Sequence, residues 1–164
     1  MSVFPVVCTA EVPPTVVEKF LSDALAGSNE LVPNSEPALA IVTAVDVLPT
    51  TASEAPLEPF TSPFLNQSVE EVSRQLNEAD LFAVLDERST EDETAVLVER
   101  KSNGSIETVR VTFDSAQHVL VALDVATLGF TEIQQIAESS GGAYGWNRTK
   151  PKKGKPAPRK RLRR

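Results

Sequence analysis

Continuous apolar runs in the first part of the chain predict two buried strands with a helix between them. Val3 to Thr9 is a β-branched apolar run, and Leu39 to Leu48 is a second run of the kind found in interior strands. Between them, apolar residues recur at helical spacing. We expect this helix to begin at Thr15, with Glu18 completing a capping box, and to end at Gly27.

A long loop and a second helix–strand unit are predicted next. Prolines recur between residues 50 and 66, which favours a loop that packs part of itself, including Phe64, on the core. Ser68 and Glu71 have the spacing of a capping box for a short helix. The run from Leu81 to Leu85 then predicts another buried strand.

The following stretch predicts a hairpin. Ala95 to Lys101 and Ile106 to Phe113 flank the dipeptide Asn103-Gly104, which favours a tight turn between antiparallel strands. Alternation in the second arm indicates that Val109, Val111 and Phe113 point inward. The acidic residues from 86 to 93, before the hairpin, are expected to form an exposed loop.

Two helices close the predicted domain. Asp114 is expected to cap the first, and Thr131 with Gln134 to form a capping box for the second. Gly141 and Gly142 indicate where the second helix ends, and Tyr144 and Trp146 follow as a last apolar contact with the body.

These elements have the order βαβαβββαα and predict an α/β (α+β) fold. The two early strand–helix units imply parallel neighbours joined by right-handed crossovers, whereas the late hairpin is antiparallel. We therefore expect a mixed sheet of about five strands with helices on its faces.

Charge divides the chain into two parts. Residues 1–147 hold six Lys and Arg against all 23 acids, a formal charge of -17, whereas residues 148–164 hold ten Lys and Arg and no acid. Three prolines and a single large apolar residue, Leu162, leave the second part nothing to bury. The sequence thus predicts an acidic α/β domain over 1–147 and a disordered basic tail over 148–164.

The basic tail resembles a bipartite nuclear-import signal. Contact with nucleic acid or a ribosome through phosphate neutralisation is an alternative, and a solubilising tail that folds back on the acidic body is another. The tail contains no aromatic residue on which bases could stack. The residues expected to bind an import receptor or a polyanion are Lys150, Lys152, Lys153, Lys155, Arg159, Lys160, Arg161, Arg163 and Arg164.

Candidate catalytic groups are few. The one cysteine, Cys8, lies in an apolar run and is expected to be buried, and a single cysteine excludes an internal disulfide. The one histidine, His118, lies on a predicted helix with no nucleophile motif, and a glycine-rich phosphate loop is absent. These features favour a non-enzymatic interaction module without a cofactor.

No apolar run is long enough to span a bilayer, and the N-terminus lacks the basic region of a signal peptide. We therefore expect an intracellular protein without membrane contact, nuclear in a eukaryotic cell and otherwise cytoplasmic.

Carboxylates leave two further hypotheses open. Asp46 and Asp86 lie near the ends of two predicted strands, and with Asp124 they could hold a hard cation in a small metal-assisted enzyme, although solvated loop acids are the simpler interpretation. A run of four acids is expected either to be an exposed loop or to dock a basic protein partner. These four are Glu87, Glu91, Asp92 and Glu93.

Several stretches follow an order of strand, loop, strand pair, amphipathic helix and a phenylalanine near an acid. They are LFAVLDERST (81–90), TAVLVER (94–100), TVRVTF (108–113), HVLVALDVAT (118–127) and GFTEI (129–133), preceded by the opening VVCTAEVPPTVVEKFLSDAL. In this order they resemble a family of small proteins defined only as a domain of unknown function. The resemblance implies the same order of elements and no activity.

The chain departs from that family's pattern at three places. Cys8 to Glu11 stands where the family has an Arg-Thr-Asp-Phe-type segment, and Thr127 to Phe130 stands where it has an Asn-Met-Asp-Phe-like string. The first predicted helix also lacks the family's tryptophan.

Overall fold

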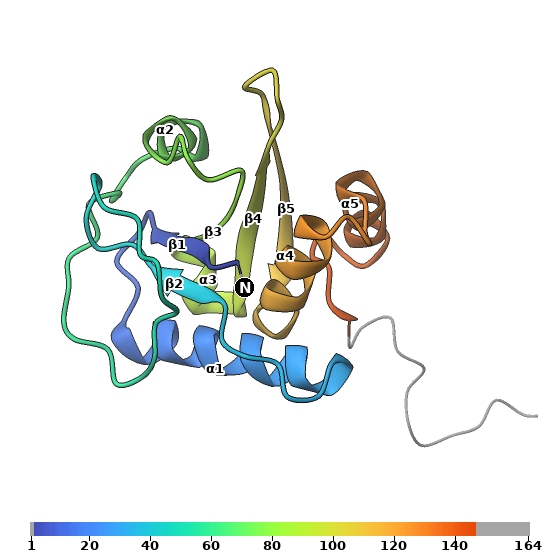
Figure 1. Cartoon of the computed structure of the whole chain (residues 1–164), viewed down its shortest axis with the longest axis horizontal. Coiled ribbons are helices and arrows are strands. Elements are labelled where there is room, and N and C mark those ends of the chain that lie inside the picture. Colours follow the sequence, from blue (N-terminus) through green and yellow to red (C-terminus); the bar gives the residue numbers. More distant parts are fainter. Residues whose placement is uncertain (1, 147–164) are drawn as a thin grey trace, which may run out of the picture.

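The computed structural model describes residues 2–146, and within them five strands form one mixed sheet in the order β2-β1-β3-β4-β5 (Figure 1). The first three strands are parallel, and the last two run antiparallel to their neighbours. The strands are β1 (Phe4–Cys8), β2 (Leu39–Ile41), β3 (Leu81–Leu85), β4 (Thr94–Arg100) and β5 (Ile106–Thr112). The predicted α/β fold with a mixed five-stranded sheet is confirmed.

Helices cover both faces of the sheet, with α1 and α2 on opposite sides of it (Figure 1). The helices are α1 (Pro14–Leu31), α2 (Val69–Gln75), α3 (Glu87–Asp92), the 3-10 helix η1 (Phe113–Ser115), α4 (Ala116–Asp124) and α5 (Phe130–Ser139). Within the described residues, no helix has both the length and the apolar character needed to cross a membrane.

The alternation of side chains along the strands creates two cores. On one face, Val6 and Leu85 pack with α1, α4 and α5, and the rings of Phe20 and Phe113 meet edge to face at 5.1 Å. On the other face, Val84 and its neighbours pack against α2 and the long loop. Phe64 of that loop is fully buried, as predicted.

Strand β2 ends at Ile41 rather than at the predicted Leu48. The next carbonyl along this edge of β1, that of Cys8, accepts a hydrogen bond from the Ser62 hydroxyl instead of from a longer β2. The chain after β2 therefore cannot continue its backbone hydrogen bonds to β1. It leaves the sheet as a loop in which Val47 is 64% exposed. An apolar run alone could not reveal this competition for one acceptor.

Helix α1 is longer than predicted at both ends. It begins one residue before Thr15, because a proline fits the first helical position, and Glu18 does not form a capping box there. The Glu18 carboxylate instead accepts a hydrogen bond from the Leu57 amide at 2.9 Å. The helix also continues past Gly27, which was expected to end it.

The acidic stretch from 86 to 93, predicted as a loop, contains the short helix α3. The Ser89 hydroxyl accepts a hydrogen bond from the Asp86 amide at 2.9 Å and so caps the first turn. Arg88 and Asp92 form an (i, i+4) ion pair at 2.9 Å. Without an apolar stripe, the sequence carries only these polar signals for a helix.

One of the other two predicted capping boxes is wrong. The Ser68 hydroxyl accepts from the Glu71 amide at 3.1 Å, which confirms the cap of α2. Helix α5 instead begins before Thr131, and the Gln134 side chain donates to the carbonyl of Thr108 on β5. Gln134 thus binds the sheet edge rather than the end of its own helix.

The hairpin and the end of the described chain are as predicted. Gly104 occupies the turn with φ +87°, and the inward residues Val109, Val111 and Phe113 are buried. Tyr144 pairs with Val111 as a short parallel bridge on the outer edge of β5. This pairing holds Tyr144 and Trp146 against the body, both at most 9% exposed.

Candidate functional site

Five carboxylates from three parts of the fold line one groove beside the last described residues. The groove has a volume of about 460 Å³, and Gly145 and Trp146 form one of its walls. Its acids are Asp23 and Glu30 from α1, Asp92 and Glu93 from the end of α3, and Asp114 from η1. We call these residues and the two wall residues the acidic groove.

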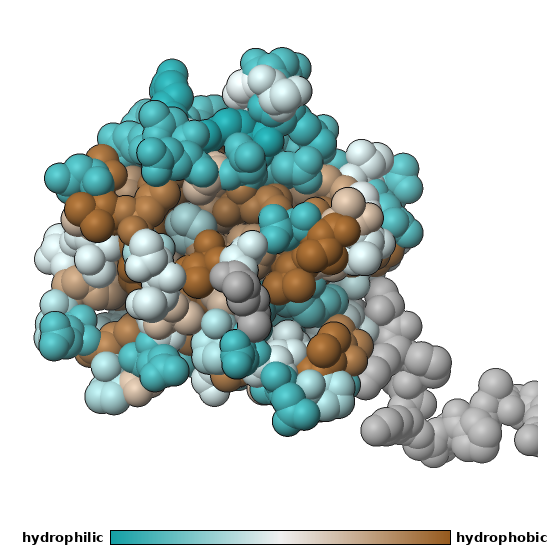
Figure 2. Space-filling view, viewed as in Figure 1, coloured by the Kyte–Doolittle hydropathy of each residue, from teal (hydrophilic) through white to brown (hydrophobic). Residues whose placement is uncertain are grey.

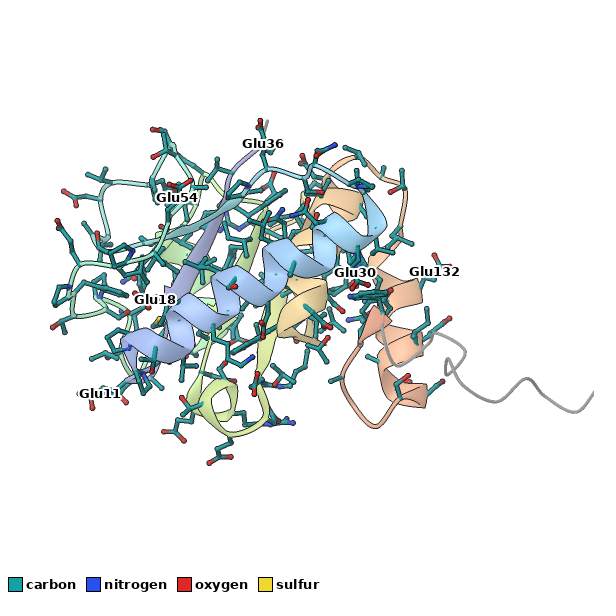
Figure 3. All side chains as sticks on the ribbon, turned by 90° about the horizontal axis from the view of Figure 1, so that it is seen from below. Glu11, Glu18, Glu30, Glu36, Glu54 and Glu132 are labelled. Carbon is teal, nitrogen blue, oxygen red and sulfur yellow. The ribbon has the colours of Figure 1, made fainter. Side chains whose placement is uncertain are left out.

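Helical spacing places two of these acids together. Asp23 and Glu30 are seven residues apart, which is close to two turns, so both side chains lie on the same face of α1. Figure 3 shows Glu30 on the C-terminal half of α1, on the side of the molecule that carries α5 and Glu132.

Gly27 brings this face of α1 against η1. A Cβ atom at Gly27 would lie 1.8 Å from the carbonyl oxygen of Asp114, so no larger residue fits without displacing the backbone. The close approach puts the α1 acids next to Asp114. Asp114 was expected to cap α4, but Ser115 occupies that position, and the Asp114 carboxylate accepts from the Thr112 hydroxyl at 2.5 Å.

The other two acids, Asp92 and Glu93, lie at the turn between α3 and β4. Glu93 has φ +55° directly after α3, and this conformation turns the chain into β4. After this turn, Asp92 and Glu93 both line the groove.

One cation of the body, Lys19, pairs with two of the groove acids. The Lys19 ammonium lies 2.7 Å from Asp23 Oδ2 and 2.9 Å from Glu93 Oε2. Its hydrogen bonds to these two carboxylates raise the pKa of Lys19, and the bond to Asp23 has the larger effect. At Asp92, burial opposes ionisation, but the Thr94 hydroxyl and Arg88 outweigh it and lower the pKa of this acid. Lys19 and Arg88 thus pair with three of the groove acids, Asp23, Asp92 and Glu93.

A second groove, of about 480 Å³, has a mainly apolar lining. It runs between the C-terminal end of α1 and α4, and three of its residues, Leu31, Val32 and Val125, are 45% to 62% exposed. Figure 2 shows apolar surface at both of these elements.

The three carboxylates considered for a metal do not converge. Asp86 follows β3 at the carboxyl end of the parallel strands, whereas Asp124 accepts a hydrogen bond from Ser2, which precedes β1 at their amino end. Asp46 lies in the exposed loop after β2. Among residues 2–146 there is no cluster of three or more His, Cys, Asp or Glu that could hold a metal ion.

Asp86 is occupied by a structural ion pair. Its carboxylate pairs with the Arg110 guanidinium, which also donates to the Thr94 hydroxyl at 3.0 Å. Burial alone would raise the pKa of Asp86, but the hydrogen bonds and charge of Arg110, together with Ser89, lower it. Asp86 therefore stays ionised and links β3 to β5.

The single cysteine and the single histidine have packing roles. Cys8 is 3% exposed, and burial raises the pKa of its thiol to about 11, as expected for a structural cysteine. The His118 ring is partly buried and lies 6.4 Å from the ring of Tyr144. Burial lowers the pKa of His118, with partial opposition from the charge of Asp114.

The sequence revealed only part of the acidic groove. Asp92 and Glu93 belong to the acidic run named as a docking surface, but Asp23, Glu30 and Asp114 were missed. The seven-residue spacing on α1 was a readable signal for the first two. The nine predicted tail residues, from Lys150 to Arg164, lie outside the described residues.

In comparisons with known proteins, no family model, curated protein or solved structure matches this chain.

Proposed function

We propose that this protein is a non-enzymatic interaction module in which an acidic α/β body presents a basic C-terminal segment to a partner. The observation that carries this proposal is the division of charge at one point of the chain, with -17 over residues 1–147 and ten cations over residues 148–164. Opposite charges divided in this way along a chain are typical of an interaction tail attached to a folded domain.

The state of the reactive side chains supports a non-enzymatic role. Cys8 is buried with a raised pKa, and Asp86 is held by Arg110. His118 packs beside Tyr144. A nucleophile or a general base needs a partner and an approach for substrate, and these three groups are committed to packing or pairing.

The basic segment acts as a nuclear-import signal in a eukaryotic cell, with an import receptor as its partner. A fluorescent fusion of the full chain, expressed in such a cell, tests this targeting role. Changing the nine residues from Lys150 to Arg164 to Gln is expected to move the fusion from the nucleus to the cytoplasm. The same distribution for both fusions would remove the targeting role.

Contact with nucleic acid or a ribosome is the second candidate, and the same ten cations favour it. Lys and Arg bind phosphates by releasing condensed counterions, without any need for aromatic residues. In a cell without a nucleus this is the role that we propose for the segment, with the protein in the cytoplasm.

The resemblance to a family defined as a domain of unknown function adds no activity to this proposal. It is consistent with the order of elements, and membership of that family stays a prediction.

A further inference from the structure

The hairpin between β4 and β5 carries a chemical motif that the proposed function does not use. Its turn holds the dipeptide Asn103-Gly104, and Asn103 is the only asparagine of the chain that a glycine follows. Figure 1 shows the end of this hairpin standing away from the rest of the domain. Residues 102 to 105 are all exposed to solvent. Water and the neighbouring backbone can therefore both reach the side-chain amide of Asn103.

Gly104 gives the backbone nitrogen after Asn103 room to move. Among the described residues, and apart from its two chain neighbours, no atom lies within 4 Å of the place where a Cβ at Gly104 would stand. Glycine also adopts backbone conformations that a Cβ disfavours, and here φ is +87°. The Gly104 nitrogen can therefore turn toward the Asn103 side chain without a steric clash.

Two backbone hydrogen bonds keep the turn closed. The Gly104 amide donates to the Lys101 carbonyl at 2.9 Å, and the Lys101 amide donates to the Ser105 carbonyl at 2.8 Å. Both lie at the exposed end of the hairpin, where local opening costs far less free energy than global unfolding. Opening the first bond releases the Gly104 nitrogen, while β4 and β5 can stay paired along their length.

Ser105 polarises the amide group of Asn103. The backbone amide and the hydroxyl of Ser105 donate to Asn103 Oδ1 at 3.0 Å and 2.6 Å. Two donors on one amide oxygen draw electrons from the amide carbon, and they stabilise negative charge that develops on the oxygen when a nucleophile attacks that carbon. The Asn103 amide carbon is thus more open to attack than an amide carbon without such donors.

We propose that Asn103 is a site of spontaneous deamidation, at which the exposed turn converts with time into aspartate and isoaspartate. The Gly104 nitrogen loses its proton to hydroxide and bonds to the Asn103 amide carbon. The bond from this carbon to the side-chain nitrogen then breaks, and ammonia leaves with a proton taken from water. A cyclic imide remains. Because the nucleophile belongs to the next residue of the same chain, the attack is intramolecular and needs no enzyme.

Water completes the reaction by opening the imide. Opening at the side-chain carbon gives aspartate, and opening at the main-chain carbon gives isoaspartate, in which the backbone runs through the side chain. Both products add one negative charge to the hairpin end. Isoaspartate also lengthens the backbone by a methylene group. The reaction depends on this turn alone and does not rest on the proposed function.

Peptide mapping of the full chain tests the proposal. The folded protein is incubated at mildly alkaline pH in water enriched in heavy oxygen and is then digested in ordinary water. Water opens the imide, so each conversion during the incubation places heavy oxygen in the new carboxylate, whereas conversions during digestion carry none. Chromatography separates the aspartate and isoaspartate peptides, which have the same mass.

Two other asparagines of the same chain provide internal references. Asn34 and Asn66 are also exposed, but Ser35 and Gln67 follow them. We expect the Asn103 peptide to gain labelled product about tenfold or more faster than either reference peptide, because a side chain on the following residue hinders ring closure and raises the barrier.

Two matched variants assign the product to this site. Asn103→Gln keeps an amide at the hairpin end, but its longer side chain would have to close a larger ring. Isoaspartate should therefore disappear from this peptide. Asn34→Gln makes the same change at another exposed position and should leave the conversion of Asn103 as it is in the unchanged chain.

The rate of conversion should also rise by about tenfold for each pH unit, since the deprotonated fraction of the Gly104 amide grows in that proportion well below its pKa. An Asn103 peptide that keeps its amide, or that converts no faster than the Asn34 and Asn66 peptides, would overturn the proposal. Aspartate without isoaspartate would overturn it as well, because direct hydrolysis of the side chain yields only aspartate.

Discussion

At the scale of single residues, Gly27 decides whether α1 can reach η1. The space for a methyl group is filled by the Asp114 carbonyl, at 1.8 Å from the ideal Cβ position. Helix propensity alone favours alanine over glycine by about 1 kcal/mol. For Gly27→Ala, helix propensity therefore predicts a higher free energy of unfolding, whereas the contact with Asp114 predicts a lower one.

We predict that Gly27→Ala lowers the free energy of unfolding by about 2 kcal/mol or more, because overpacking against backbone forces a shift of α1. Denaturant unfolding of the full chain measures it. The control is Ala26→Gly at the exposed neighbouring position, with an expected loss of about 1 kcal/mol from propensity. A gain in stability for Gly27→Ala would contradict the close approach.

Asp86 gives a residue-scale prediction with a pH dependence. Its side chain and that of Arg110 are 28% and 13% exposed, so Asp86→Asn leaves a mostly buried guanidinium without its counter-charge. We expect a loss of about 1–3 kcal/mol in the free energy of unfolding at neutral pH. Asp124→Asn, at an exposed acid, is the control and is expected to change it little.

The sign of the pH effect follows from the lowered pKa of Asp86. The unfolded chain binds this proton more readily than the folded one, so the contribution of Asp86 is fully present above its unfolded pKa of about 3.9. It is lost as the pH falls through the lower folded value. The difference in stability between the unchanged chain and Asp86→Asn should thus shrink below about pH 4, and a constant difference down to pH 2 would contradict the ion pair.

At the scale of elements, Arg100 of β4 completes the short helix α2. Its guanidinium donates to the carbonyls of Asn77 and Leu76, both at 2.7 Å, and to that of Ser73, so it satisfies groups at the C-terminal end of the helix. A seven-residue helix is too short to be stable by itself. The contact joins α2 to the sheet.

We predict that Arg100→Lys loosens α2 while the sheet remains intact. One ammonium group cannot reproduce the forked geometry of guanidinium, so about 1–2 kcal/mol of local stability should be lost. Hydrogen exchange of the α2 amides measures the change, and Arg74→Lys on the exposed side of α2 is the control. Unchanged α2 protection in Arg100→Lys would show that the guanidinium does not hold the helix.

Elements with a strong apolar pattern could be predicted from the sequence, and those decided by distant polar contacts could not. The hairpin around Gly104 and the buried strand β3 follow from local pattern and turn chemistry. The short β2 depends on Ser62 reaching Cys8, 54 residues away, and the close packing of α1 on η1 depends on Gly27 lying against Asp114. No local rule contains such contacts.

At the scale of the whole molecule, the division of charge could be read directly from the sequence, but the acidic groove could not. Its acids come from α1, the end of α3 and η1, and the positions of these elements are set by packing around Gly27 and by the left-handed Glu93. The sequence thus predicted an acidic body, and the structure adds where its charge gathers.

The salt dependence of binding to a random DNA duplex tests the role of the basic segment most directly. For the full chain, the logarithm of the binding constant should fall linearly with the logarithm of salt concentration, by about 0.9 for each phosphate neutralised. Changing the nine cations from Lys150 to Arg164 to Gln in the full chain should abolish both the binding and the slope. Binding that does not change with salt concentration, or that persists after the nine substitutions, would contradict the claim that the basic segment binds the partner.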